Sequence, residues 1–141
     1  MPRFRDLVQQ RDLFRVEEHQ SVADVARKMA DLHVGAILVF SGDELRGVFR
    51  ERDLMKRVVL ERRDSDQTPV SAVMSTGVVT IEEVASLEDA MESMQTNNCR
   101  HLGVTRGSQV VAFLSMRDLM NFELASKIEE IHHMRAYIHN A

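Results

Sequence analysis

The sequence RDLM at Arg52–Met55 occurs a second time at Arg117–Met120, 65 residues further along the chain. The correspondence extends outward without a gap, so that Ser21–Met55 aligns with Ser86–Met120 throughout. Apolar positions correspond even where the residue identities differ. A repeat of this length is a structural unit used twice rather than a local motif. Two like units packed together predict a pseudo-two-fold cleft, and a cleft between halves is a usual place for a ligand.

Each unit is predicted to fold in the order strand, helix, strand, strand, helix. In the first unit, the apolar run Ala36–Phe40 is typical of a buried strand, and turn residues at Ser41–Glu44 join it to Leu45–Phe49 as a hairpin. Ser21 is a predicted helix N-cap, because apolar residues follow it at helical spacing. The pattern predicts an α/β (α+β) fold of two β-α-β-β-α units. The second unit repeats it at Val78–Ile81, Ser86–Asn97, His101–Thr105, Val110–Leu114 and from Met116.

The chain divides into four segments by this pattern. Residues 1–60 hold an N-terminal segment and the first unit, the charged linker 61–69 ends in Pro69, and residues 70–122 hold the second unit. Residues 123–141 have no counterpart between the units. They are predicted to form an amphipathic helix that packs either on its own domain or on a second subunit. Its apolar stripe consists of Leu124, Ile128, Ile131, Met134 and Ile138.

The composition is that of an ordinary globular chain, with 44% hydrophobic and 28% charged residues among 141. A net charge of −4 argues against a general nucleic-acid binder. There is no apolar stretch of membrane-spanning length and no signal-type apolar core after the first residues. The single cysteine, Cys99, is expected to be a half-buried reduced thiol. We therefore expect a cytoplasmic protein that has neither nucleic acid nor membrane as a partner.

Ser115 and Asp118 follow the last predicted strand and form the sharpest local pattern. One interpretation is helix capping, with the serine as N-cap and the aspartate in the first turn. The first unit has Arg50 in place of that serine but still has Asp53. An aspartate present without its capping serine indicates a second role. A carboxylate at a cleft accepts hydrogen bonds from a vicinal diol, as in ribose recognition, and free N–H groups at a helix start bind phosphate.

The repeat order and the strand-to-helix motifs resemble a pair of CBS domains (a Bateman module) from about Phe4 to Phe122. The resemblance implies a sensor rather than an enzyme, with no catalytic cofactor. Such pairs bind adenine-containing ligands, namely AMP, ATP, NAD(H) or S-adenosylmethionine, in clefts between the units. A change of conformation then signals to a separate, unknown effector protein. The matching stretches are Val34–Val39, Gly47–Leu54, Val70–Met74, Arg100–Val104 and Ala112–Leu119.

The resemblance also implies roles for individual residues. Asp118 would hold the ribose hydroxyls, Ser115 would lie beside the ribose or phosphate, and Thr80 would hydrogen-bond the ligand. In the first unit, Asp53 is the ribose candidate. The adenine pocket would be lined by the backbone and side chains of His101, Leu102 and Val104 in the second unit, and Ala36, Ile37 and Val39 would form the pocket wall in the first.

Arginines near these positions are candidate phosphate partners, because guanidinium matches phosphate geometry. Arg52, Arg117 and Arg100 have this role, with a solvated surface position as the alternative. Two departures from the family pattern favour the second unit's site. Arg50 replaces a common serine or threonine, and Arg15 stands where the second unit has Thr80.

Other functions have less support. A metal site at His132, His133 and His139 lacks acidic or cysteine ligands at fitting spacing, and Ser115 has no base nearby in sequence. The alternative to a nucleotide sensor is a structural dimerisation module without ligand. A homodimer is expected in either case, built on the helices that follow the hairpins. Its apolar contacts are predicted at Leu54, Val58, Val59, Leu119 and Met120.

Overall fold

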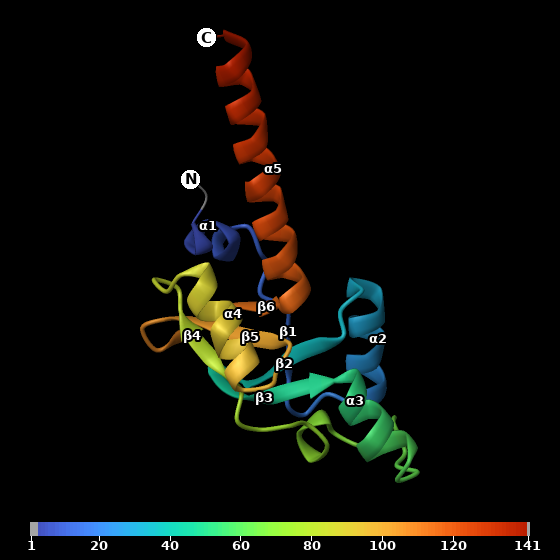
Figure 1. The fold of residues 1–141 in the computed structure, drawn as a ribbon. Coiled ribbons are helices and arrows are strands. Elements are labelled where there is room, and N and C mark those ends of the chain that lie inside the picture. Colours follow the sequence, from blue (N-terminus) through green and yellow to red (C-terminus); the bar gives the residue numbers. More distant parts are fainter. Residues whose placement is uncertain (1–2, 141) are drawn as a thin grey trace. The chain divides into compact units, whose positions relative to one another are not determined.

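The computed structural model describes residues 3–140 and divides the chain into two compact units, each built on a three-stranded sheet (Figure 1). One unit comprises Leu13–Val78 and contains the first repeat. The other joins the N-terminal segment up to Asp12 to the chain from Val79 onward, and contains the second repeat. The predicted α/β class with two β-α-β-β-α units is confirmed.

In the first unit, the parallel pair β1–β2 and the antiparallel pair β2–β3 form one sheet. Helix α2 begins after Ser21, whose hydroxyl accepts a hydrogen bond from the Asp24 backbone N–H at 3.1 Å, as predicted for an N-cap. The elements are β1 (Arg15–Glu17), α2 (Val22–Leu32), β2 (Ala36–Ser41), β3 (Glu44–Arg50), α3 (Glu51–Asp53), the π-helix η1 (Leu54–Val59) and the 3₁₀-helix η2 (Val70–Ala72).

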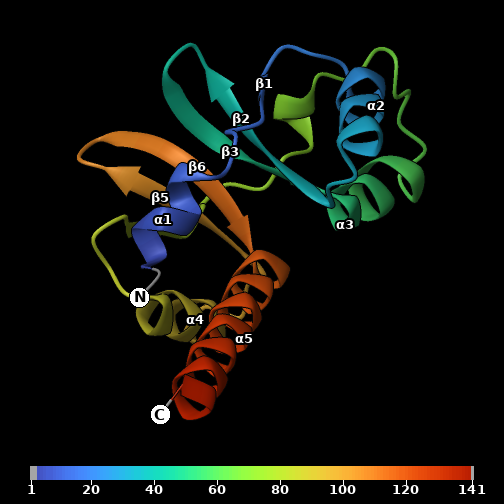
Figure 2. The ribbon, with the colours of Figure 1, turned by 90° about the horizontal axis from the view of Figure 1, so that it is seen from above.

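The second unit has the same topology, with β4 parallel to β5 and β5 antiparallel to β6. Ser86 caps its first repeat helix through a hydrogen bond from the Asp89 backbone N–H at 3.0 Å. Figure 2 shows α1 over the β5–β6 hairpin, in agreement with its packing on β6. The elements are α1 (Phe4–Gln9), β4 (Thr80–Glu82), α4 (Leu87–Thr96), β5 (His101–Arg106), β6 (Gln109–Ser115) and α5 (Met116–Asn140).

The two hairpins share their local irregularities. Each has a register shift in its central strand, after Val39 in β2 and after Val104 in β5. Each turns at a glycine with positive φ, +58° at Gly42 and +62° at Gly107. Glycine adopts this conformation without steric cost. The repeat seen in the sequence is therefore also a repeat of backbone conformation.

The helix after the first hairpin is not a continuous α-helix. After one α-turn, the chain continues as the π-helix η1, and the Leu60 N–H donates to the Met55 carbonyl five residues earlier at 3.0 Å. The second repeat has no such break, since α5 is a single α-helix. A π-turn inserts one extra residue per turn and is common at functional positions. The repeats thus diverge at the helix that carries the candidate aspartate.

Each unit's hydrophobic core is completed by the segment that precedes the other repeat in the chain. Phe4, Leu7 and Val8 of α1 are buried in the core of the second repeat's unit. Val70 and Val73 are buried in the core of the first repeat's unit. The sequence-based segments 1–60 and 70–122 follow chain order, whereas packing exchanges these two short pieces. Apolar spacing predicts that such a piece is buried, but not against which sheet.

The helices after the hairpins expose less apolar surface than the sequence analysis expected. Val58 and Leu119, predicted to contact a second copy, are almost fully buried in the cores of their own units, and Leu54 is half-buried. That prediction is wrong for these side chains, because each helix turns them toward its own sheet. Val59 and Met120 are exposed, as expected.

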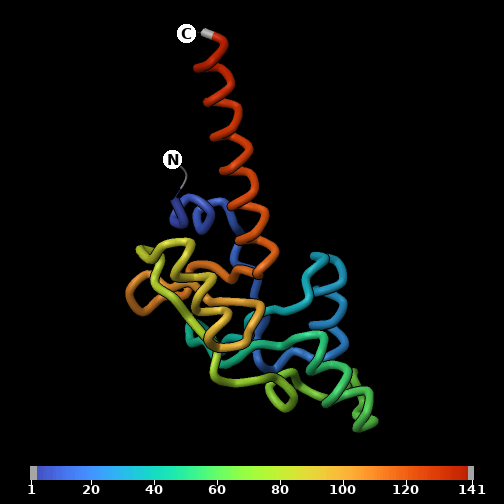
Figure 3. The backbone as a smooth tube through the Cα atoms, viewed as in Figure 1, coloured from blue at the N-terminus to red at the C-terminus, as the bar shows by residue number. Residues whose placement is uncertain are grey.

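Helix α5 is the longest element and leaves the body of its unit. Its first turns pack on α4 and β6, and Figures 1 and 3 show its C-terminal turns extending past α1 and α4. All residues from Lys127 to His139 are exposed. Within the described part of the chain, neither α5 nor any other helix has the length and apolar character to cross a membrane.

Candidate functional site

In the second repeat, Ser115 ends β6 and Asp118 lies in the first turn of α5. The Ser115 backbone N–H donates to Asp118 Oδ2 at 2.8 Å, and the Asp118 N–H donates to Ser115 Oγ at 3.1 Å. These reciprocal bonds are a capping box, so the capping interpretation is confirmed. They occupy one carboxylate oxygen and leave Oδ1 for another partner.

That second partner is Arg11 of the N-terminal segment. Its guanidinium lies 3.1 Å from Asp118 Oδ1, and the two side chains are 44% and 23% exposed. The ion pair is therefore open to solvent. An exposed pair contributes about 0–1 kcal/mol, so a ligand that offers good hydrogen bonds can compete for this oxygen at little cost. Sequence reasoning missed Arg11, because the segment that carries it is distant in the chain and belongs to no motif.

The strand register brings the other predicted residues of this site onto one face of the sheet. Thr80 lies opposite Gly103, and His101 lies opposite Ser115. Since side chains alternate along a strand, Thr80, His101 and Ser115 point to the same side. The His101 ring stacks on Phe113 at 5.1 Å between centroids. This face carries one aromatic stack beside two hydroxyl groups.

Leu102 and Val104 lie on the opposite face of the same strand. Both side chains have 0% exposure and belong to the hydrophobic core. The expectation that their side chains line an adenine pocket is therefore wrong, because they pack against the helices of the unit. Among the three predicted pocket residues of this strand, His101 is the one whose side chain faces outward.

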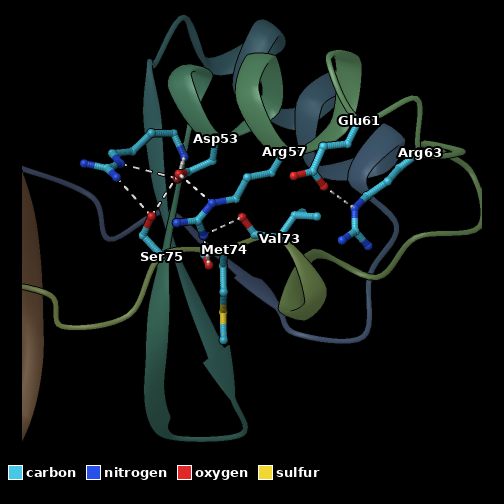
Figure 4. A network of polar contacts seen from close by, with 8 residues as sticks. Asp53, Arg57, Glu61, Arg63, Val73, Met74 and Ser75 are labelled. Atoms are coloured by element: carbon cyan, nitrogen blue, oxygen red, sulfur yellow. Dashed lines mark hydrogen bonds and ion pairs between the residues drawn. The ribbon is translucent and has the colours of Figure 1, made fainter.

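The first repeat closes its corresponding site with its own side chains (Figure 4). The Asp53 side chain is only 4% exposed. Ser75 Oγ donates to its Oδ1 at 2.8 Å, and the Arg50 backbone N–H donates to its Oδ2 at 3.0 Å. The Arg50 and Arg57 guanidinium groups lie 3.3 and 4.0 Å from the carboxylate. Both oxygens are thus already engaged.

The same network ties the segment after η2, at Met74 and Ser75, to the helix that follows β3. Arg57 donates to the carbonyl of Met74 at 2.7 Å, and Arg50 donates to Ser75 Oγ at 3.0 Å. Arg57 stands four residues after Asp53, and this helical spacing could have revealed the ion pair from sequence. Ser75 carries no such signal. The Asp53 carboxylate can accept a ribose only after this network breaks.

The other residues predicted to line a pocket in the first repeat have buried side chains. The side chains of Ile37 and Val39 are 1% and 0% exposed and belong to the core of their unit, which corrects their expected role as pocket wall. Ala36 is likewise buried. Three arginines proposed as phosphate partners are exposed on the surface: Arg52, Arg100 and Arg117.

A separate groove of about 800 Å³ lies in the second unit, between α1, the start of α4 and α5. None of the predicted site residues lines it. Its charged lining has five glutamates against two arginines and one lysine, which disfavours an anionic ligand. At one wall, Arg106 donates two hydrogen bonds to the Glu83 carboxylate, at 2.6 and 2.9 Å. This pairing holds the pKa of Glu83 below its usual range.

Comparison with known proteins gives a consistent result. The CBS domain profile matches residues 5–60 and 70–125. CBS domain-containing protein YhcV of Bacillus subtilis is 36% identical over 104 residues, 74% of each chain. A structure of a protein with CBS domains from Burkholderia ambifaria has a TM-score of 0.81 at 29% identity, covering 88% of this chain and 95% of its own. A CBS domain protein from Pyrobaculum aerophilum complexed with AMP has a TM-score of 0.74 at 27% identity, covering 89% and 99%.

Proposed function

Because the chain belongs to the CBS domain family and carries two CBS domains in tandem, we propose that it is a regulatory protein that binds an adenine-containing nucleotide at its second repeat. The observation that supports this choice of site is the contrast between two equivalent aspartates. Asp118 is partly exposed and shares one oxygen with a solvent-exposed arginine. Asp53 is buried, and its own chain occupies both of its oxygens.

In the proposed complex, Asp118 Oδ1 accepts hydrogen bonds from the ribose hydroxyls in place of Arg11. The displaced guanidinium of Arg11 becomes available to a phosphate oxygen. Ser115, Thr80 and His101 lie on the same outward face, where they would contact the sugar, the phosphate and the base. The ligand class is AMP, ATP, NAD(H) or S-adenosylmethionine, and the AMP-bound relative from Pyrobaculum aerophilum supports it.

Ligand exchange at Asp118 would alter the attachment of the N-terminal segment, because Arg11 belongs to it. That link offers a route from nucleotide binding to a change of conformation. The signal would pass to a separate effector protein. The protein is proposed to act as a homodimer in which binding, and not catalysis, is the function. A purely structural dimerisation module remains the alternative outcome of the test below.

The test is calorimetric titration of AMP, ATP, NAD, NADH and S-adenosylmethionine into wild type and the variant Asp118→Ala. Hydrogen bonds to a charged group contribute about 1.5–3 kcal/mol, so the variant should bind at least about 10-fold more weakly. Asp89→Ala is the matched control, since Asp89 forms the same capping box with Ser86 on α4 of the same unit. It should bind as wild type does. No binding of any nucleotide at millimolar concentration would favour the structural module.

A further inference from the structure

The C-terminal half of α5 is exposed along its length and contributes one wall of the groove described above, through residues such as Lys127 and Met134. Four large apolar side chains, Ile128, Ile131, Met134 and Ile138, are between 47% and 69% exposed along it. A single solvated helix of this length is marginal in water. Several large apolar residues on one exposed face are also unusual for a monomer. This face therefore indicates a partner that covers it.

From Met120 onward, five apolar residues recur with a period of seven at two positions of a heptad, and Ile128 lies beside them at an e position. A repeat of 3.5 residues per turn keeps one seam facing a second helix, as in a left-handed coiled coil. One polar residue, Lys127, interrupts the seam. In heptad notation the a positions are Leu124, Ile131 and Ile138, and the d positions are Met120, Lys127 and Met134.

The charges that flank the a and d positions favour a second copy of this helix as the partner and favour a parallel orientation of the two helices. Glu130 occupies a g position and Arg135 the next e position. In a parallel pair of identical helices, these residues face each other across the seam twice. In an antiparallel pair, the g positions face each other, which would place Glu130 against Glu130. We propose that residues 120–138 form a parallel two-stranded coiled coil with the same segment of a second copy of this chain.

The same charges disfavour a membrane as the occupant of this face. Helices that lie on anionic membranes carry lysine and arginine on their polar side. Here Glu123 and Glu130 line one edge of the apolar stripe, and an anionic surface would repel them. The proposal rests on the homodimer proposed above and identifies residues 120–138 as an interface between its two copies. It does not depend on nucleotide binding.

Lys127 sets the strength of the association. In the parallel arrangement two copies of Lys127 oppose each other in the seam, and a lone polar residue there specifies register at a cost in stability. The dimer is therefore expected to dissociate on dilution. Replacing this residue with leucine should tighten it by at least about 10-fold, because the substitution adds apolar burial on both helices.

The first experiment is sedimentation equilibrium of the full chain over a range of concentrations. Wild type should dimerise at micromolar concentration. Ile131→Asp should raise the dissociation constant at least about 100-fold, because it places two charges in the seam. Ala136→Asp is the matched control, since it adds the same charge at an exposed position outside the seam, and it should change the constant less than about 3-fold. A monomeric wild type, or a dimer equally strong in Ile131→Asp, would overturn the proposal.

Two further variants test the parallel direction. Glu130→Arg and Arg135→Glu should each weaken the dimer, and the double variant should recover it. If antiparallel pairing holds instead, like charges face each other in wild type and in each variant, so neither single variant weakens the dimer and the proposed direction is wrong. In a Cys99→Ser background, Ile131→Cys should form a disulfide-linked dimer on mild oxidation, because parallel pairing places the two copies of this residue side by side. Failure of this cross-link would also overturn the proposal.

These measurements are separable from the test of nucleotide binding. The substituted positions from residue 127 onward lie on the exposed part of α5, far along the helix from Asp118. Ile131→Asp should therefore retain the midpoint of thermal unfolding of the isolated subunit and its nucleotide affinity. A monomer that binds nucleotide would overturn the homodimer and its coiled coil but not nucleotide binding, and a coiled-coil dimer without nucleotide affinity would overturn only the sensor.

Discussion

The two equivalent aspartates should differ strongly in their contribution to stability, and the variants Asp53→Ala and Asp118→Ala compare them directly. Asp53→Ala removes the acceptor of the Ser75 hydroxyl and of the Arg50 backbone N–H in a site that is almost fully buried. It also leaves two guanidinium groups without their carboxylate. Because these arginine side chains are 40% and 46% exposed and stay solvated, the cost comes mainly from the two lost hydrogen bonds to the carboxylate, about 1.5–3 kcal/mol each and roughly 4 kcal/mol together.

Asp118→Ala removes a capping contact and an exposed ion pair. A lost capping residue costs about 1 kcal/mol, and an exposed salt bridge contributes at most about 1 kcal/mol. The sum is about 1–2 kcal/mol. Asp53→Ala should therefore destabilise the protein by about 2–3 kcal/mol more than Asp118→Ala, although the two residues occupy the same position in the repeat.

Urea unfolding monitored by far-UV circular dichroism measures this difference in the free energy of unfolding. Asp89→Ala serves as control, because it removes an exposed capping box of the same geometry and no buried network. Its cost should be that of a capping contact alone, about 1 kcal/mol. Equal losses for Asp53→Ala and Asp118→Ala would refute the reasoning that the first repeat's aspartate is a structural residue.

Two other residues carry predictions. Hydrogen bonds from Arg106 lower the pKa of Glu83. The stability that this pair adds is therefore present at neutral pH and is lost as the pH falls through the folded-state pKa, below the ordinary glutamate range. The midpoint of thermal unfolding of Glu83→Gln should fall less in acid than that of wild type, and parallel pH profiles of the two proteins would contradict this. Gly47 lies so close to Met74 and Ser75 that a Cβ at this position would be 2.5 Å from the Ser75 carbonyl oxygen. Gly47→Ala should therefore cost about 1–3 kcal/mol in urea unfolding, even though the second repeat has Ala112 at the same place, and an unchanged midpoint would count against that contact.

Much of the fold could be predicted because its causes are local. Apolar runs such as Ala36–Phe40 identify buried strands. Serines such as Ser21 and Ser86 cap the helices that directly follow them, and the hairpin turns need a residue such as Gly42 with positive φ. The repeat then doubles every one of these signals. Helix and strand assignments therefore agree with the structure in both units.

The features that escaped prediction depend on contacts between distant parts of the chain. No local pattern indicates that Arg11 meets Asp118 or that Ser75 meets Asp53. The exchange of the short pieces has the same origin, since the apolar residues of α1 would suit either sheet. Ile37 and Leu102 were misassigned for a different reason. The resemblance implied a pocket from whole strands, whereas side-chain alternation sends every second residue into the core.

The exchange of segments between the repeats also has a consequence for synthesis of the chain. Helix α1 is synthesised before either repeat, yet its side chains pack with residues such as Leu114 and Leu119. At about 5–20 residues per second, those partners follow about 5–20 s later. The first repeat, in contrast, needs only the chain up to Val73 to close its core. While the second repeat is being synthesised, the nascent chain therefore carries one complete unit and an apolar helix, α1, that is exposed to chaperones until Leu114 and Leu119 have emerged.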